Sequence, residues 1–425
     1  MKFLLYCFFF TLTMPFLPAI GGEVLVYEIP LTIMFISLPL ALRRHNIHFQ
    51  GLDFGVLAYL IISVLSTFIN PDSNTFYDAA RYFRWTVLPP VAIYAIIRFA
   101  PLSLGAMYQG LYWMMPGIIF RGVLLVQDYS HYGVRGMQYG GSFVTTGIFI
   151  AIGVILLLFV DKRNFTILLS ILRYIMLGFL FVCLVLTFSR GVVIGTIIFS
   201  LISAIVWKNI KWKKYFGQIV LGTIIFISLV IGSGALFLEP VSVPERAMLE
   251  KTYHRLYEKD LYLHDIYGLF NVWSMLSQDV LQNNFFLGKG MAATKVGYDA
   301  SDYQSYGSSH NFFVSMLRRS GILGAIIMFW MIWLTYKNMV DTDLNSHQIN
   351  TIGKTLLTII STLILVGFTN DFMSGNRCLI WFIFISYTTR ISGHTNDERC
   401  YGRFRARKCL NSKSDVDKTC KKNLC

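Results

Sequence analysis

Two stretches of this 425-residue sequence combine residue types that can move a proton and hold an anion. The first, "SSHNFFVSMLRRSGILG", contains His310, and Arg318 and Arg319 follow about two helical turns later. A neutral imidazole, whose unperturbed pKa is about 6.5, can accept a proton from a hydroxyl group at neutral pH. Two adjacent arginines on a helix point in different directions. We therefore expect one of them at most to face a site with His310 and the other to meet lipid headgroups.

The second stretch, "LTFSRG", joins two apolar segments with almost no loop between them. Its Arg190 is therefore expected at or just inside a membrane surface, where burying a lone guanidinium is costly. A guanidinium binds a phosphate through two parallel hydrogen bonds, which an ammonium group cannot do. The position and the residue type together predict an anion site. The alternative is that Arg190 binds no ligand and its charge only helps to set the orientation of the spans in the membrane.

Three further arginines could take part in binding an anion. Arg135 lies in "YSHYGVRGMQYGGS", a short loop with glycines on both sides, where it could bind an anion or cap the loop. Arg246 and Arg255 lie in an amphipathic segment whose acidic residues offer ordinary surface ion pairs. The pattern alone leaves both interpretations open for all three.

The composition is that of a membrane protein, with 55% hydrophobic, 16% aromatic and only 14% charged residues. A soluble domain normally carries about a quarter charged residues. The net charge of +14 is explained by Lys and Arg gathered in cytoplasmic loops and facing anionic headgroups, so a nucleic-acid partner is not expected. The seven cysteines match no zinc pattern, and no cluster has the spacing of metal ligands, so no metal is expected.

Apolar runs of membrane-spanning length recur along the chain and predict an all-α integral membrane protein with about twelve transmembrane helices. One long periplasmic loop separates the ninth helix from the tenth. The resulting parts are helices 1–9 in residues 1–238, the loop domain in 239–319, helices 10–12 in 320–390, and a basic cytoplasmic tail in 391–425. The predicted spans are 3–20, 24–42, 52–69, 85–100, 106–127, 143–160, 165–188, 191–207, 215–237, 320–336, 354–370 and 377–390.

The positive charges of the short loops predict the orientation of these spans. Arg43, Arg44 and the basic loop at 208–214 fall on one side, which the positive-inside rule assigns to the cytoplasm. Both termini are then cytoplasmic. The exceptions, which lie on the outer face, are Arg81, Arg84, Arg135 and Arg377.

The long outer segment is expected to contain short helices. One covers "ERAMLEKTYHRLYEKDL", another covers "GLFNVWSMLSQDVLQ", and a third covers "HNFFVSMLRRS" and leads into the tenth span. Ser309 is a residue type that caps helices and is the expected cap of the third.

Together these stretches resemble the bacterial O-antigen ligase and O-antigen polymerase family. "LTFSRGVVIG" resembles the SRG signature of the family, and "NVWSMLSQDVLQNNFFLGKG" resembles its tryptophan-containing helix before a G-x-G turn. "SSHNFFVSMLRRSGILG" resembles its His-Asn motif, and "RGMQYGG" resembles a further element of the family. There is one departure: Leu269 stands where the family usually has an arginine before the position of Trp273. Arg255 or Arg246 could replace that arginine.

The resemblance implies a metal-independent, inverting glycosyltransferase of the bacterial inner membrane that needs no cofactor. Its donor would be an undecaprenyl-diphosphate-linked glycan, used at the periplasmic face among the membrane lipids. His310 would activate the acceptor hydroxyl, and Arg190, with Arg135 or Arg255, would hold the diphosphate as it leaves.

Two alternatives stay open beside a ligase that passes the glycan to the lipid A core in lipopolysaccharide biosynthesis. A polymerase of the same family would pass the glycan to a second lipid-linked repeat by the same chemistry. A transporter of lipid-linked oligosaccharides would instead place charges along a path through the spans, with helix breaks near the midplane. The charges of this sequence gather on the outer face, which favours the enzyme.

Overall fold

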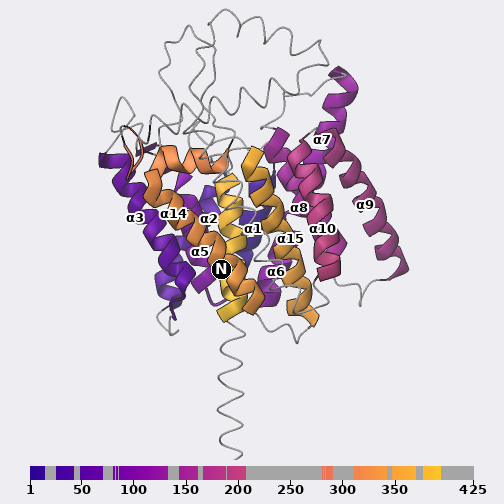
Figure 1. The fold of residues 1–425 in the computed structure, drawn as a ribbon. Coiled ribbons are helices and arrows are strands. Elements are labelled where there is room, and N and C mark those ends of the chain that lie inside the picture. Colours follow the sequence, from indigo (N-terminus) through magenta and orange to yellow (C-terminus); the bar gives the residue numbers. More distant parts are fainter. Residues whose placement is uncertain are drawn as a thin grey trace, which may run out of the picture.

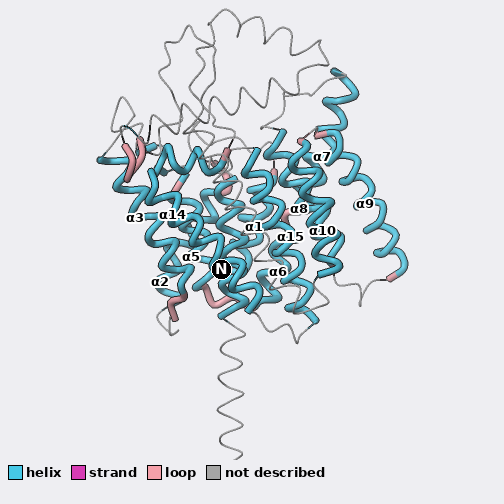
Figure 2. Tube along the Cα trace, in the orientation of Figure 1, coloured by secondary structure: helices cyan, strands magenta, loops and turns pink. Residues whose placement is uncertain are grey.

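The computed structural model describes residues 1–14, 25–42, 48–69, 80–81, 83–84, 86–132, 143–160, 166–187, 189–206, 280, 282, 284–290, 311–341, 347–369 and 377–393. Within these ranges the chain forms helices and no strand (Figure 2). A final helix covers residues 377–393. The other helices are α1 (Lys2–Thr13), α2 (Glu28–Leu42), α3 (Gly51–Ile69), α5 (Leu88–Phe99), α6 (Leu104–Tyr112), α7 (Met115–Tyr132), α8 (Phe143–Phe159), α9 (Ile167–Leu186), α10 (Arg190–Val206), α14 (Phe312–Asp341) and α15 (His347–Thr369).

The helices have the length and the composition of membrane spans. Among the described residues, four helical stretches are long and apolar enough to cross a membrane by these criteria: Gly51–Ile69, Leu104–Gln127 (which comprises α6 and most of α7), Ile167–Leu186 and Phe312–Met339. Six shorter apolar helices accompany them within the described residues: Lys2–Thr13, Glu28–Leu42, Leu88–Phe99, Val144–Phe159, Gly191–Ser203 and Thr351–Gly367. The prediction of an all-α membrane protein is confirmed. The total of twelve spans stays a prediction, because the ninth predicted span, 215–237, lies outside the described residues, as do most of the long loop and the tail.

The first helix is shorter than its apolar run. The sequence predicts a span over 3–20, but α1 ends at Thr13, and Met14 adopts an extended conformation with φ −71° and ψ 122°. The physical reason is Pro15, because a proline disfavours helical geometry in the residue before it. Twelve residues span roughly 18 Å, which is less than the roughly 30 Å of a hydrocarbon layer. A helix of this length that starts at one surface therefore ends inside the membrane.

The run predicted as one span over 106–127 forms two helices. α6 ends at Tyr112, a turn covers Trp113 and Met114, and α7 begins at Met115. Pro116 explains the break, because proline has no amide hydrogen for the helical bond to residue 112 and its ring clashes with that carbonyl.

The short helix predicted over "HNFFVSMLRRS" and the tenth predicted span, 320–336, are both present in α14 and are separated by a sharp bend. α14 starts at Phe312, and Gly321 has φ 63° and ψ −164°, which is not helical geometry. The residues before Gly321 therefore form a short helix that lies across the end of the bundle, and those after it form the long spanning segment (Figure 1).

The helices form two groups that meet at a central layer. α2, α3, α5 and α14 lie on one side, α7, α8, α9 and α10 lie on the other, and α1, α6 and α15 lie between them (Figure 1). α3 packs along α14, and α10 packs along α15. A Cβ atom on Gly55 would lie 2.8 Å from Cγ of Met331, so a small residue allows α3 to approach α14 closely.

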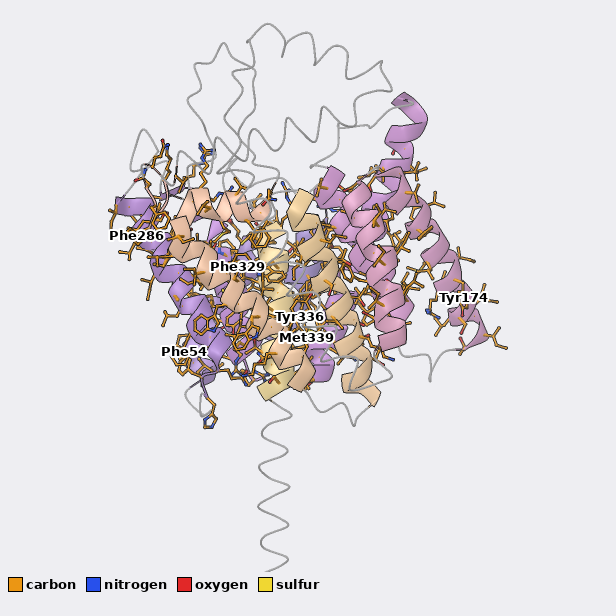
Figure 3. The ribbon with its side chains drawn as sticks, viewed as in Figure 1. Phe54, Tyr174, Phe286, Phe329, Tyr336 and Met339 are labelled. Carbon is orange, nitrogen blue, oxygen red and sulfur yellow. The ribbon has the colours of Figure 1, made fainter. Side chains whose placement is uncertain are left out.

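The final helix forms much of the core, and α9 lies at the periphery. Residues 378–387 are all buried, and Trp381 is among the largest fully buried side chains. By contrast, Tyr174 of α9 is 57% exposed and Phe54 of α3 is 54% exposed, and both project outward from the bundle (Figure 3). Exposed aromatic side chains on apolar helices face lipid in a membrane protein.

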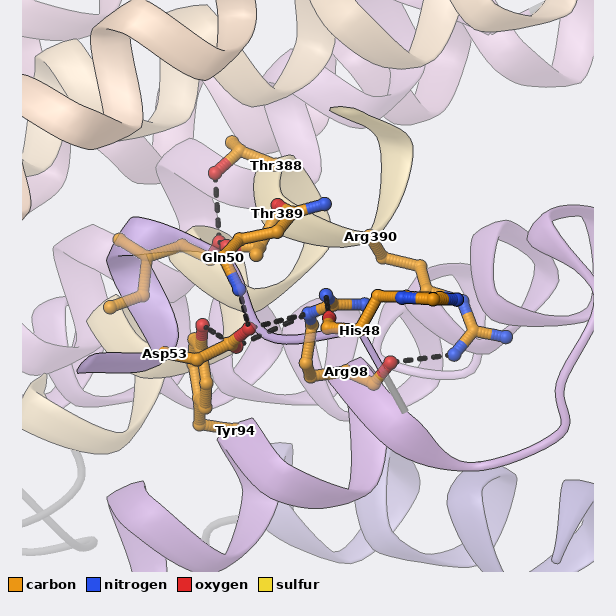
Figure 4. Close-up of polar contacts among 9 residues, drawn as sticks. His48, Gln50, Asp53, Tyr94, Arg98, Thr388, Thr389 and Arg390 are labelled. Carbon is orange, nitrogen blue, oxygen red and sulfur yellow. Dashed lines mark hydrogen bonds and ion pairs between the residues drawn. The ribbon is translucent and has the colours of Figure 1, made fainter. Parts of the chain in front are cut away.

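A buried polar cluster locks the helix ends at one side of the bundle (Figure 4). Asp53 of α3 accepts a hydrogen bond from the hydroxyl of Tyr94 at 2.7 Å and forms an ion pair with Nε of Arg98 at 3.2 Å. Arg390 donates to the carbonyl of Arg98 at 2.6 Å and to that of Leu102 at 2.9 Å. The start of α3, the end of α5 and the end of the chain's last described helix are thereby joined at the side predicted to be cytoplasmic.

Candidate functional site

The helix that follows the His-Asn pair has a buried cap at its N-terminus. The side chain of Asn311 is fully buried, and its Oδ1 accepts hydrogen bonds from the amides of Phe313 at 2.8 Å and Val314 at 3.2 Å. These are the amides that an N-cap side chain normally satisfies. The expected cap, Ser309, is wrong, because Asn311 stands next to the first helical residue and fills this role. Position 310 is consequently the residue directly before the cap.

The turn over 284–290, which contains the G-x-G motif, is bonded through its backbone to the bend in α14. The amide of Lys289 donates to the carbonyl of Arg318 at 2.7 Å, and the amide of Gly290 donates to the carbonyl of Arg319 at 3.1 Å. These two carbonyls belong to the last turn before the bend, where the helical partners are missing. The turn therefore completes the hydrogen bonding of the short helix.

In a further hydrogen bond, α14 is the donor and the turn is the acceptor. The amide of Ile322 donates to the carbonyl of Phe285 at 2.9 Å. Gly288 has φ 67° and Gly321 has φ 63°, values that side chains other than hydrogen rarely allow. Two glycines far apart in the sequence thus meet where the turn and the bend touch.

Both arginines of the short helix are buried. Arg318 is 5% exposed and Arg319 is 2% exposed, so neither meets lipid headgroups at the surface, and the expectation that one of them does is wrong. The reason is the bend at Gly321, which lays the short helix across the bundle end and allows it to be covered on several sides. The hydroxyl of Ser66, near the end of α3, donates to the carbonyl of Arg319 and ties the helix to α3.

The SRG turn between α9 and α10 is tight and internally bonded. The hydroxyl of Thr187 donates to the carbonyl of Leu184 at 2.7 Å, and the amide of Ser189 donates to the Thr187 hydroxyl oxygen at 3.3 Å. A Cβ atom on Gly147 of α8 would lie 3.3 Å from that hydroxyl oxygen, so α8 packs directly against the turn. Arg190 is the first residue of α10. The first amides of a helix lack helical partners and favour a negative charge nearby.

The starts of α10 and α14 lie at the same end of the bundle. Gly195 lies beside Leu365, and the hydroxyl of Thr358 donates to that of Ser203 at 2.7 Å, so α10 and α15 are antiparallel. α14 and α15 are consecutive and also run in opposite directions (Figure 1). Arg190 and the capped helix after position 310 are therefore brought to one face, which is the face predicted to be periplasmic.

Three predicted site residues lie outside the described residues. They are His310, Arg135 and Arg255. For Arg190 the structure describes the position of the backbone. Among the residues that the structure does describe, no group of three or more His, Cys, Asp and Glu side chains could hold a metal ion.

A comparison with protein families found a match, which covers the segment that contains these elements. Residues 175–329 match the family model described as O-antigen ligase. This segment is similar to the O-antigen ligase family. The matched residues contain the SRG turn, the turn that is bonded to α14, and the His-Asn helix with its bend. The resemblance seen in the sequence is confirmed, and the O-antigen ligase match places the described site elements in one family unit. A comparison with curated proteins found no match.

Two features of this O-antigen ligase segment have signals in the sequence that are easy to overlook. Asn311 precedes an apolar helix, and asparagine is among the best N-cap residues, so it could have been read as the cap. Gly321 follows Ser320 inside an apolar pattern, where an isolated glycine also fits an ordinary helix interior. The role of Gly321 becomes visible only with its partner turn in place.

Proposed function

We propose that this chain is a glycosyltransferase of the bacterial inner membrane. It moves an undecaprenyl-diphosphate-linked glycan onto a sugar hydroxyl at the periplasmic face. The observation that carries the proposal is the O-antigen ligase match over residues 175–329, because this family acts in polysaccharide biosynthesis. The acceptor in our proposal is the lipid A core, which makes the reaction the ligation step of lipopolysaccharide biosynthesis. The reaction needs no metal and no cofactor.

In the proposed reaction, the neutral imidazole of His310 accepts the proton of the acceptor hydroxyl. The hydroxyl oxygen forms a bond to the anomeric carbon of the lipid-linked sugar, and the bond from that carbon to the diphosphate oxygen breaks. The diphosphate leaves with the bonding electron pair, and Arg190, with Arg135 or Arg255, stabilises its growing negative charge. Attack from the face opposite the leaving group inverts the anomeric configuration.

The geometry of the described residues supports these roles. Asn311, which directly follows His310 in the sequence, is the buried cap of the short helix that begins α14. Arg190 begins α10 at the same end of the bundle, where the helix terminus adds to the positive potential. A base and an anion site at one membrane face are what a lipid-linked donor requires, because its diphosphate lies at the membrane surface.

The proposed orientation of the protein in the membrane follows from the charges of its loops. We infer that both termini are cytoplasmic, as the positive-inside rule predicts. The polar cluster of Asp53, Arg98 and Arg390 then lies at the cytoplasmic ends of the helices. The starts of α10 and α14 lie at the opposite, periplasmic end.

The test is transfer by the purified full-length chain in reconstituted membranes that contain the lipid-linked donor. We expect His310→Ala to lower the rate by about 10²–10⁴, because this is the usual cost of losing a general base. His48 offers a matched control, because its side chain is exposed and its carbonyl, which accepts a bond from Arg98, survives in His48→Ala. Near-normal transfer by His310→Ala at equal amounts of folded protein would refute the assignment.

The same assay separates a ligase from a polymerase. Offered lipid A core, a ligase yields glycan attached to the core in one step. Offered only lipid-linked repeats, a polymerase yields a ladder of longer lipid-linked glycans. We expect the core to be the better acceptor, and a ladder without core attachment would favour the polymerase.

A further inference from the structure

Arg121 is a buried arginine in the middle of α7 to which the proposed reaction assigns no role. It is 6% exposed, and its Nε donates to the carbonyl of Thr13 at 2.6 Å. Its guanidinium carbon lies 4.9 Å from the centre of the Phe149 ring, which is the geometry of a cation–π contact. One side chain of α7 therefore contacts the end of α1 on one side and α8 on the other.

The contact with Thr13 satisfies the end of α1, a helix that is too short to cross a hydrocarbon layer. α1 ends at Thr13, and the last carbonyls of a helix have no helical partners. An unsatisfied carbonyl in hydrocarbon costs several kcal/mol, so broken helices in membranes need a donor from a neighbouring helix. Arg121 is such a donor. The approach is close, because a Cβ atom on Gly117 of α7 would lie 2.7 Å from the Thr13 backbone.

The contact with Phe149 connects Arg121 to the SRG turn through α8. Phe149 and Gly147 are two residues apart on α8 and therefore face different directions. Phe149 faces Arg121, whereas Gly147 packs against Thr187 in the SRG turn. The outer half of α8 is thus held between Arg121 and the turn that carries Arg190.

We propose that Arg121 is a positioning residue for the transfer reaction, acting on Arg190 through α8. This inference rests on the proposed function. Through Phe149, Arg121 fixes the rotation of α8 and its position along its own axis. Through Gly147, α8 in turn packs against the SRG turn and supports it. A displacement of about 1 Å far from the chemistry can cost about 10²-fold in rate, so loss of this support lowers transfer even when the protein stays folded.

Arg173 supplies the matched control for a purely structural role. It is 5% exposed, and it donates to the carbonyl of Leu157 at 2.6 Å and to that of Leu158 at 3.2 Å. Like Arg121, it is a buried arginine that satisfies carbonyls at a helix end and contacts α8. Its contacts, however, lie at the opposite end of α8 from the SRG turn.

The first measurement compares Arg121→Gln with Arg173→Gln in full-length, reconstituted protein. Both changes remove a buried guanidinium, so both are expected to lower the melting temperature. Per molecule of folded protein, we expect Arg121→Gln to lose about tenfold or more in transfer rate and Arg173→Gln to stay within about twofold of the unaltered chain. Equal losses in the two variants would overturn the positioning role.

The second measurement is a double-mutant cycle with Arg190→Lys. If Arg121 acts through Arg190, Arg121→Gln should cost much less in the Arg190→Lys background than alone, less than about twofold. Losses that multiply would mean that the two arginines act independently, and they would overturn the proposal. If Arg121→Gln yields no folded protein, Phe149→Leu makes the same test, because it removes the ring and keeps an apolar side chain. Unchanged transfer by Phe149→Leu would also overturn it.

The failure of this inference differs from the failure of the proposed function. If the unaltered chain transfers no glycan to either acceptor, both are overturned. If the unaltered chain is active and Arg121→Gln behaves like Arg173→Gln, only the positioning role is overturned.

Discussion

Gly288 and Gly321 touch through their backbones, although thirty-two residues separate them in the sequence. A Cβ atom on Gly288 would lie 2.5 Å from the amide nitrogen of Gly321, and one on Gly321 would lie 2.6 Å from the amide nitrogen of Gly288. Both have positive φ, and Gly321, with ψ −164°, occupies a region that is essentially restricted to glycine. The contact fixes the bend of α14 and hence the direction of the short helix that follows position 310.

We predict that Gly321→Ala detaches the turn from the bend. The added methyl group would collide with backbone atoms that cannot move aside, and the conformation itself costs about 1–3 kcal/mol for a residue with a side chain. We expect a lower melting temperature in detergent and loss of most transfer activity. Gly288→Ala should behave in the same way, because its Cβ atom meets the other side of the same contact.

Gly178 is the control for the glycine variants. It lies inside α9, and a Cβ atom there meets nothing within 4 Å. Gly178→Ala should therefore be neutral or should stabilise the helix by up to about 1 kcal/mol. If Gly321→Ala keeps the stability and the activity of Gly178→Ala, the contact does not hold the site.

We predict that Asn311→Ala weakens the short helix and the base before it. Loss of an N-cap typically costs about 1 kcal/mol, and here two amides lose their acceptor in a buried place. Transfer should fall because Asn311 directly follows the proposed base His310 in the sequence. Asn311→Ser, which keeps a capping oxygen, should retain more stability and more activity. The check is the melting temperature and the transfer rate of both variants. Equal behaviour of the Ala and Ser variants would contradict the role of the cap.

A third prediction concerns the ion pair between Asp53 and Arg98, which lies at the other end of the bundle. Arg98→Ala leaves the buried carboxylate without its cation, and breaking a buried pair costs about 3–5 kcal/mol. We expect less folded protein and a lower melting temperature. The transfer rate per folded molecule should stay within about twofold of the unaltered chain, because the pair does not touch the proposed site. A large loss in that rate would mean that the two ends are coupled.

The sequence predicts most helices well because a helix that crosses a membrane needs an apolar run of a certain length, and such runs are visible in the sequence. The run 143–160 corresponds to α8 at Phe143–Phe159, and the run 52–69 corresponds to α3 at Gly51–Ile69. Where an apolar run continues past a proline, the proline determines where the helix ends. Pro15 ends α1 early although the apolar residues continue, and Pro116 separates α6 from α7.

The site is harder to predict because its shape depends on contacts between distant segments. The bend at Gly321 requires the turn around Gly288, and nothing in the local pattern indicates this partner. The burial of Arg319 follows from the bend and from Ser66 of α3. Likewise, the sequence shows Arg121 only as a single charged residue in an apolar run. Its role depends on its hydrogen bond to Thr13 at the end of α1, which the sequence does not show. Residue types indicate the chemistry, whereas tertiary contacts determine where it takes place.

The last prediction is that Arg190→Lys loses most of the transfer activity even though it keeps the positive charge. A diphosphate offers paired oxygens that match the planar guanidinium, and a lysine cannot reproduce this two-bond geometry. Arg190 is the first residue of α10. If its only role there is to set the topology, a positive charge is sufficient, and Arg190→Lys should be as active as the unaltered chain. Arg190→Ala should lose at least as much as Arg190→Lys. The assay is transfer from the purified lipid-linked donor in reconstituted membranes, with insertion measured separately, and full activity of the lysine variant would remove the two-bond clamp from the mechanism.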